Sequence, residues 1–160
     1  MAKLLFGVLM SVVWWMLHAL QLDEEMAIGT LSSLKQAVNR ASHAAAQQID
    51  LDKLELGIVS IDGRRAEQAA ILYLADNLGL NEQLTPSPGS LLRDPVEVRV
   101  FEVLDESLTY PYTYRNDLYD YEVTFARPGV VLIIHVVYPL LFGVLDQIEW
   151  DVRGSAELVY

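Results

Sequence analysis

The stretch LLFGVLMSVVWWMLHALQLDEE, residues 4–25, decides how the rest of the chain is interpreted. It carries no formal charge from Leu4 to Leu22 and then presents three consecutive carboxylates. A helix over the uncharged part would be about 28 Å long, close to the thickness of the hydrocarbon core of a bilayer. A lysine precedes it, and two tryptophans lie toward its far end, where aromatic rings favour the headgroup region. We therefore predict a transmembrane anchor over residues 1–22.

Two other interpretations of this segment stay open at the level of sequence. A cleaved signal peptide also has a basic start and an apolar middle, although only Leu17 and Ala19 stand at the spacing of its small-residue cleavage pattern. A core helix of a soluble domain would also be apolar along its length. If the anchor is retained, the positive-inside tendency predicts a single-pass protein of the cell membrane, with a cytoplasmic amino end and residues 23–160 exported.

Composition narrows the classes of partner. Of the 160 residues, 52% are apolar, which is more than the core of a soluble domain of this size needs, so membrane lipid is the first expected partner. The net charge is −11 and the eleven Lys and Arg residues are scattered, which argues against nucleic acid as a ligand. The chain has no cysteine, so it contains neither a disulfide framework nor a thiolate metal site.

The residues after the carboxylates predict a continuation of the first helix. From Asp23 to Gln48 the sequence lacks proline and is rich in good helix formers. A second helix is expected over residues 64–81, with Asp62 as its N-cap and Gly79 as its end, so that residues 23–84 are the helical part of the exported domain. Apolar residues of the first helix recur at steps of four and three, which predicts a seam that packs on the domain: Ala27, Leu31, Leu34, Val38, Ala41 and Ala45.

The second half of the chain, residues 95–160, is predicted to be rich in strands. Alternating apolar and polar residues follow Val96, Tyr119 and Ile148. The run at residues 129–145 is apolar on both faces, and its β-branched residues favour a central buried strand, although a second membrane span stays open. The predicted fold class is α+β, with a long amino-terminal transmembrane helix that continues into an amphipathic helix packed on a roughly four-stranded antiparallel sheet.

No sequence motif points to catalysis or to a cofactor. The three histidines, His18, His43 and His135, do not stand at metal-ligand spacing, and nucleotide-binding, hydrolase and metalloprotease motifs do not occur. We expect no enzyme activity, no cofactor and no metal site. Two clusters of carboxylate residues superficially suggest calcium-binding loops, but neither follows the ligand pattern of such a loop, so solvated loops are favoured. The clusters are Asp50, Asp52 and Glu55, and Asp117, Asp120 and Glu122 beside Asn116.

Tyrosines are concentrated in YPYTYRNDLYDYE, residues 110–122. Within a hairpin they would fall on one face and form cross-strand aromatic pairs. They would equally suit a contact surface, because tyrosine supplies rigid amphipathic area and is enriched at interfaces. The sequence leaves both roles open for the candidate contact hairpin, which contains Tyr110, Tyr112, Tyr114, Tyr119 and Tyr121.

This organisation resembles the TadE/TadG-like pseudopilins of tight-adherence pilus systems. The likeness rests on the short basic start, the apolar helix that runs on into LKQAVNRASHAAAQ, and a strand-rich end containing GSAELV. Pilin-like precursors are usually cut after a glycine and carry a glutamate five residues into the mature helix. Here Gly7 precedes Val8, and Val12 occupies the glutamate position, so the processing signal of the family is absent.

The resemblance implies a pilin-like structural or accessory subunit of a surface filament or of a transfer or secretion apparatus. Its expected partners are further copies of the chain and related membrane or pilus proteins. The alternative is a membrane-tethered extracellular binding or sensor module, in which the helix serves only as an anchor. In the filament interpretation the anchor also packs against neighbouring helices, and the candidate assembly residues are Leu5, Leu9, Val13, Trp14 and Leu17.

Overall fold

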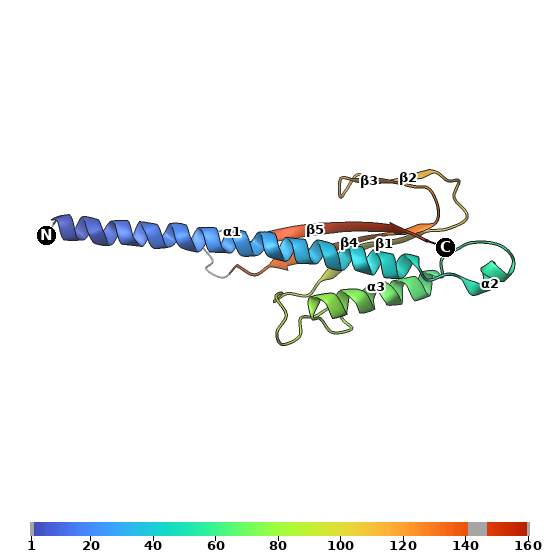
Figure 1. The fold of residues 1–160 in the computed structure, drawn as a ribbon, viewed down its shortest axis with the longest axis horizontal. Coiled ribbons are helices and arrows are strands. Elements are labelled where there is room, and N and C mark those ends of the chain that lie inside the picture. Colours follow the sequence, from blue (N-terminus) through green and yellow to red (C-terminus); the bar gives the residue numbers. More distant parts are fainter. Residues whose placement is uncertain (1, 141–146, 160) are drawn as a thin grey trace.

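A computed structural model describes residues 2–140 and 147–159, and its fold is α+β (Figure 1). A long amino-terminal helix is followed by shorter helices and then by antiparallel strands. The sequence predicts the first helix and the helix after Asp62, but not the short helix at Leu51–Glu55, which lies where a loop was expected. Asp62 caps the third helix by accepting a hydrogen bond from the Arg65 backbone N–H at 3.0 Å, and Gly79 ends it in the left-handed conformation. The elements are α1 (Ala2–Ala46), α2 (Leu51–Glu55), α3 (Gly63–Leu78), β1 (Glu97–Leu104), β2 (Tyr112–Asn116), β3 (Tyr121–Phe125), β4 (Gly129–Tyr138) and β5 (Ile148–Glu157).

The domain has three layers built around one central sheet. Strands β1, β4 and β5 form that sheet in the order β1-β4-β5, with antiparallel pairing throughout. Helices α1 and α3 pack together on one of its faces, and the β2–β3 hairpin covers the other. Both faces of the sheet are therefore covered (Figure 1), and each has its own apolar core.

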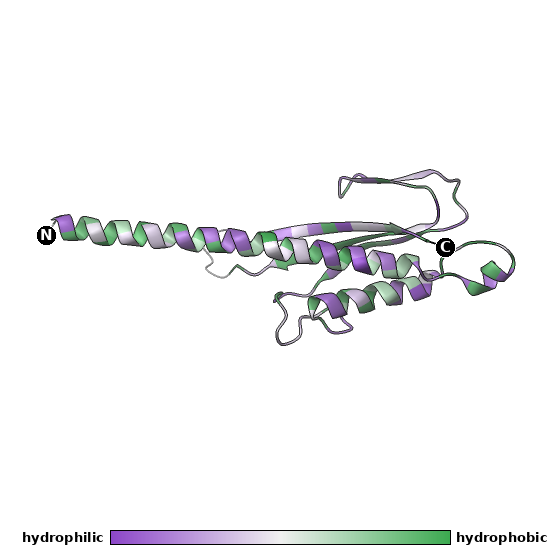
Figure 2. Cartoon of the chain, viewed as in Figure 1, coloured by the Kyte–Doolittle hydropathy of each residue, from purple (hydrophilic) through white to green (hydrophobic). Residues whose placement is uncertain are grey.

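Helix α1 extends far beyond the domain. Its 45 residues correspond to about 67 Å of helix at 1.5 Å per residue. The half that follows Asp23 lies against the sheet and α3, whereas the preceding half projects away from every other element and is strongly apolar (Figures 1 and 2). The domain and the projecting segment thus share one unbroken helix.

Strand β4 is the central strand of the sheet, which confirms the strand prediction for Gly129–Tyr138. Successive side chains of a strand point to opposite faces, and here both faces are covered. One set packs under the helices and the other under the hairpin, which explains why the sequence is apolar at nearly every position. The part of the predicted run at residues 141–145 lies outside the described residues.

The prediction of a single, roughly four-stranded sheet is wrong. The structure has a three-stranded sheet and a separate two-stranded hairpin. The imperfect alternation after Val96 also has a structural cause. Val98 pairs with Ile134 and Val100 with Ile133, so Arg99 is an extra residue that shifts the side-chain alternation of β1.

Close contact between α1 and β5 depends on Gly154. A Cβ atom at this position would lie 2.6 Å from Val38 Cγ1 and 3.0 Å from Ser42 Oγ, both on α1. We expect Gly154→Ala to lower the free energy of unfolding by about 1–3 kcal/mol, because overpacking forces the helix and the strand apart. Chemical denaturation of the full-length chain in detergent micelles measures this change.

Gly29 provides a matched control for the same substitution. A Cβ atom on Gly29 meets nothing within 4 Å, and the residue lies inside α1. Gly29→Ala should raise the free energy of unfolding by up to about 1 kcal/mol, because alanine is the better helix former. A Gly154→Ala protein as stable as the unmodified chain would contradict the close contact between α1 and β5.

Candidate functional site

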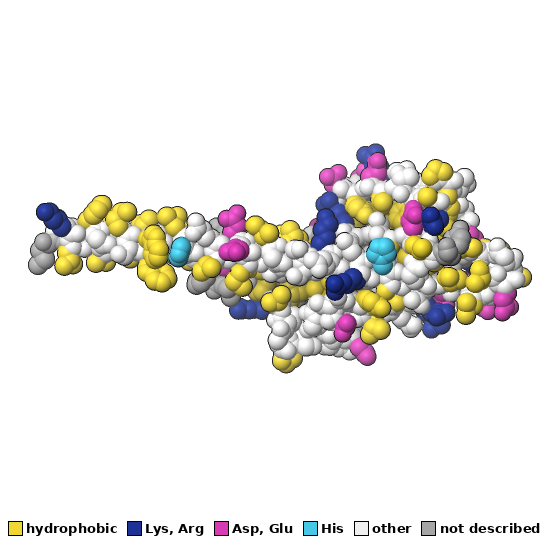
Figure 3. Space-filling model, in the orientation of Figure 1, with side chains coloured by type: hydrophobic (Ala, Val, Ile, Leu, Met, Phe, Trp, Pro, Cys, Tyr) yellow, Lys and Arg dark blue, Asp and Glu magenta, His cyan; other side chains and the backbone are white. Residues whose placement is uncertain are grey.

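The projecting part of α1 is the most unusual surface of the protein. Its most apolar 18-residue window is 0% buried, so this segment is not a core helix of the chain. Among the described residues, α1 is the helix that is long and apolar enough to cross a membrane. In Figure 3, hydrophobic side chains line the projecting segment along its length. All five candidate assembly residues lie exposed on it, by 43% to 73%: Leu5, Leu9, Val13, Trp14 and Leu17.

An aromatic group lies near the point where the apolar segment approaches the domain. The ring centroids of Trp14 and His18 are 4.5 Å apart, and those of Trp14 and Trp15 are 5.6 Å apart with an edge-to-face arrangement. Such amphipathic rings suit the boundary between hydrocarbon and headgroups. The three side chains thus mark one end of a membrane-sized surface on the helix.

The junction between the projecting segment and the domain contains a buried carboxylate. Asp23 is 1% exposed although it follows immediately after the apolar segment. Burial, together with the negative charge of Asp23, raises the pKa of the Tyr138 hydroxyl at the end of β4. The Tyr138 ring lies 5.3 Å from that of Trp150 on β5. The end of the sheet and the start of the packed half of α1 therefore meet at this junction.

The predicted seam is the face that α1 turns toward the sheet and α3. Five of its six residues are buried, and Leu31 is partly buried against the same core. The small side chains of Ala41 and Ala45 are fully buried there, which allows the helix to lie close to β5. Asp23 lies four residues before Ala27, on the same face of the helix, and so extends the seam toward the amino terminus.

The tyrosines of the hairpin pack on the second core, as the cross-strand packing role requires, and their role as a contact surface stays a prediction. In the register of the hairpin, Tyr112 lies opposite Phe125 and Tyr114 opposite Val123, so these side chains share the face turned toward β4. Tyr114 is 5% exposed. All five tyrosines belong to or pack against the second core, which also contains Leu104, Val131 and Ile133.

Polar clusters elsewhere in the described residues have partners within the fold. His135 Nδ1 lies 3.0 Å from Asp151 Oδ1, and its Nε2 lies 3.6 Å from Glu149 Oε2, a contact across two paired strands that sequence spacing did not reveal. No group of three potential metal ligands occurs within residues 2–140 and 147–159. Of the calcium candidates, Asp50 caps α2 and Asp117 pairs with Arg115, so these carboxylates serve local structure.

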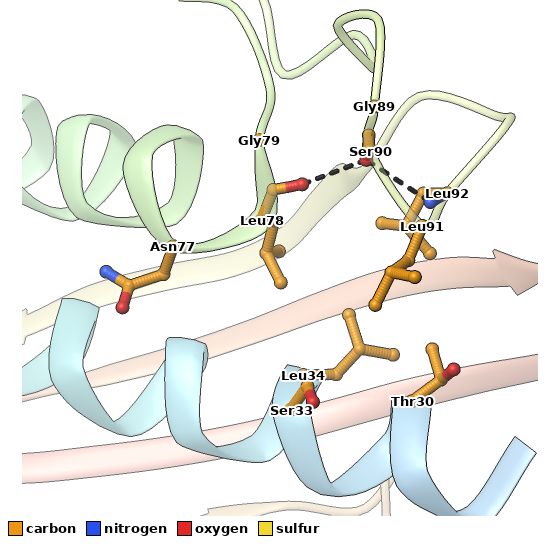
Figure 4. Close-up of a pocket in the computed structure, with 10 residues that line it drawn as sticks. All are labelled: Thr30, Ser33, Leu34, Asn77, Leu78, Gly79, Gly89, Ser90, Leu91 and Leu92. Carbon is orange, nitrogen blue, oxygen red and sulfur yellow. Dashed lines mark hydrogen bonds between the residues drawn. The ribbon is translucent and has the colours of Figure 1, made fainter. Parts of the chain in front are cut away.

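A small cavity lies between α1, the end of α3 and the loop that follows it (Figure 4). Its volume of about 210 Å³ is below the usual range for ligand pockets. Its polar groups already form hydrogen bonds with the backbone: Ser90 Oγ donates to the Leu78 carbonyl at 2.9 Å, and Asn77 Nδ2 donates to the Tyr73 carbonyl at 2.7 Å. The cavity therefore gives little support to a ligand-binding role.

We compared the chain with protein-family models, with characterised proteins and with solved structures, and none of them matched.

Proposed function

We propose that the chain is a single-pass membrane protein that acts as a pilin-like subunit of a surface filament or of a transfer apparatus. The apolar half of α1 lies in the bilayer before assembly and packs against identical helices afterwards. The same surface is thus removed from water in both states. The TadE/TadG-like resemblance belongs to this proposal, as does the orientation with a cytoplasmic amino end.

One observation supports the subunit role over a simple tether. The projecting segment and the domain-packed segment are parts of one helix, which continues through Gly29 without a break. A tether requires only an anchor and a linker, whereas a continuous helix fixes the direction of the domain relative to the apolar segment. Packing between apolar segments would therefore set the positions of the domains in an assembly.

The test is a charge at the middle of the apolar segment. Val13→Arg places a guanidinium near the bilayer centre, where a charged side chain costs about 2.5–3.5 kcal/mol on insertion scales. We expect this variant to stay in the membrane fraction, held by the remaining apolar residues, but to form no filaments. Electron microscopy of cells and fractionation of their membranes measure the two properties.

Two control variants accompany Val13→Arg. Val13→Leu keeps the site apolar and should assemble normally. Leu118→Arg introduces the same charge at an 82% exposed position on the hairpin loop and should also assemble. Filaments of normal abundance from the Val13→Arg chain would refute assembly through this helix.

A further inference from the structure

Residues 49–61 form a closed loop at the end of the domain farthest from the projecting segment, which we name the distal loop. Ile49 and Ile61 join its ends in an antiparallel bridge. The backbone N–H of Asp50 donates to the Ser60 carbonyl at 3.0 Å, and that of Asp62 donates to the Gln48 carbonyl at 2.8 Å. The two ends of the loop are therefore held together by backbone hydrogen bonds.

A side-chain network fixes the middle of the distal loop to the sheet. Lys53 Nζ lies 2.6 Å from Glu106 Oε1, just beyond β1, and 3.4 Å from Ser60 Oγ. Hydrogen bonds from Lys53 and Ser60 lower the pKa of Glu106 to about 2, so the carboxylate stays charged at neutral pH. Asp50 caps α2 by accepting a hydrogen bond from the Lys53 backbone N–H at 3.1 Å. Polar contacts thus give the loop a defined conformation.

Apolar side chains hold the distal loop only at its ends, where Ile61 is buried in the core and Ile49 and Val59 pack against it. No residue of α2 is buried. Four large apolar side chains point into solvent within eight residues, a clustering that marks interaction sites when it occurs on a structured surface. This distal apolar patch consists of Leu51, Leu54, Leu56 and Ile58, which are 59%, 41%, 78% and 40% exposed.

Charges of both signs flank the distal apolar patch. Asp52 and Glu55 are exposed on α2, and Arg64 and Arg65 are exposed in the first turn of α3, directly after the loop closes. None of the ion pairs within the described residues involves these four side chains. Figure 3 shows hydrophobic, acidic and basic side chains close together at the end of the molecule farthest from the N-terminus.

The position and the charges of the distal apolar patch indicate which kind of partner binds it. From Leu22 to Ala46 the helix rises about 36 Å, so the patch lies beyond reach of a bilayer that holds the apolar segment. The carboxylates of Asp52 and Glu55 also oppose binding to an anionic lipid surface. By contrast, an apolar centre with acids and arginines beside it is complementary to itself, as a two-fold contact requires. The net charge of −11 opposes the association of two copies only weakly, because screening at physiological salt limits charge repulsion to about 8 Å.

We propose that the distal apolar patch binds the same patch of a second copy of this chain. In the two-fold contact the apolar side chains of both copies meet, and Arg64 and Arg65 of each copy face Asp52 and Glu55 of the other. This contact goes beyond the helix packing proposed above and is separate from it. The patch is small, so the contact gains strength when both copies are anchored in one membrane and their effective concentration is high.

A single introduced cysteine tests the contact, because the chain has no cysteine of its own. The Leu56→Cys chain, in lipid vesicles, should form disulfide-linked dimers several-fold faster than the Leu118→Cys chain. Both positions carry strongly exposed leucines, at 78% and 82%, but Leu118 lies on the hairpin loop away from the patch. Equal rates of cross-linking at the two positions would overturn the proposal.

An exchange of charges tests whether the partner is a second copy. Chains with Arg64→Glu and Arg65→Glu should lose the Leu56→Cys cross-link, as should chains with Asp52→Arg and Glu55→Arg. An equal mixture of the two should restore it, because each altered surface then meets its opposite. Absence of rescue would point to a different protein as occupant and refute the contact.

Two further measurements keep the outcomes distinct. Circular dichroism checks the folding of each charge-reversed chain. If one of them fails to fold, the comparison of cross-linking rates between Leu56→Cys and Leu118→Cys is the test of the contact. Adding Val13→Arg to the Leu56→Cys chain should leave the cross-link in place even where filaments are lost. A cross-link that disappears with Val13→Arg would show that the two patches meet only through helix assembly, and would overturn the separate contact.

Discussion

Removal of residues 1–22 should transfer the protein from the membrane fraction to the soluble fraction and leave the stability of the domain unchanged. Of residues 2–22, all but the partly buried Ala19 and Leu20 are exposed, so the free energy of unfolding should change by less than about 0.5 kcal/mol. The shortened helix would begin with Asp23 and two glutamates, and acidic residues stabilise the first turn of a helix. Fractionation and chemical denaturation measure the two effects.

A replacement variant separates anchoring from specific packing. Exchanging residues 4–22 for an artificial leucine and alanine helix of equal length should retain the protein in the membrane but prevent assembly. The mass of the unmodified mature chain completes the comparison. A native chain that is soluble and begins after Ala19 would identify the segment as a cleaved signal peptide and refute the retained anchor.

The parts of the fold that the sequence predicted are those governed by local periodicity. The seam from Ala27 to Ala45 follows the near-heptad repeat, and one apolar stripe on a helix has few alternatives to packing on a core. Strand β4 was predictable because its β-branched residues alternate between two cores and leave no polar face. In both elements, neighbouring residues already determine which surface is buried.

The grouping of strands and the burial of single polar residues depend on contacts between distant segments. Alternation in Tyr121–Phe125 predicts a strand but does not say which sheet it joins, and the hairpin crosses over β4 instead of extending the sheet. This arrangement turns the tyrosines inward. Asp23 was assigned to the solvent side of the membrane, although continuing the seam back by four residues from Ala27 reaches it.

The distal loop escaped sequence analysis for a different reason. Its leucines alternate with carboxylates and with Lys53, a pattern that suggests an ordinary solvated loop. The structure shows that Lys53 is held by Glu106 and Ser60. It also shows that the apolar side chains in the middle of the loop, from Leu51 to Ile58, stay exposed. Sequence analysis therefore identified the candidate assembly surface on the helix but not the one at the far end of the domain.

Phe125→Ala should produce the largest loss of stability among single substitutions in the second core. Phe125 is fully buried where β3 ends, and its ring lies so close to Gly129 that a Cβ atom there would come within 2.5 Å of Phe125 Cε1. Removing a buried phenylalanine ring costs about 3–5 kcal/mol in lost transfer energy and cavity formation. Because the ring joins the hairpin to β4, amide hydrogen exchange in β2 and β3 should also become faster than in β1.

Thr124→Ala is the matched control on the same strand. Thr124 is exposed on the opposite face of the hairpin, where its hydroxyl lies 3.0 Å from that of Thr113. This exposed substitution should change the free energy of unfolding by about 0.5 kcal/mol or less. If Phe125→Ala were equally mild, the hairpin would not be packed on the sheet. The tyrosines would then be free to form the contact surface that the structure assigns to a core.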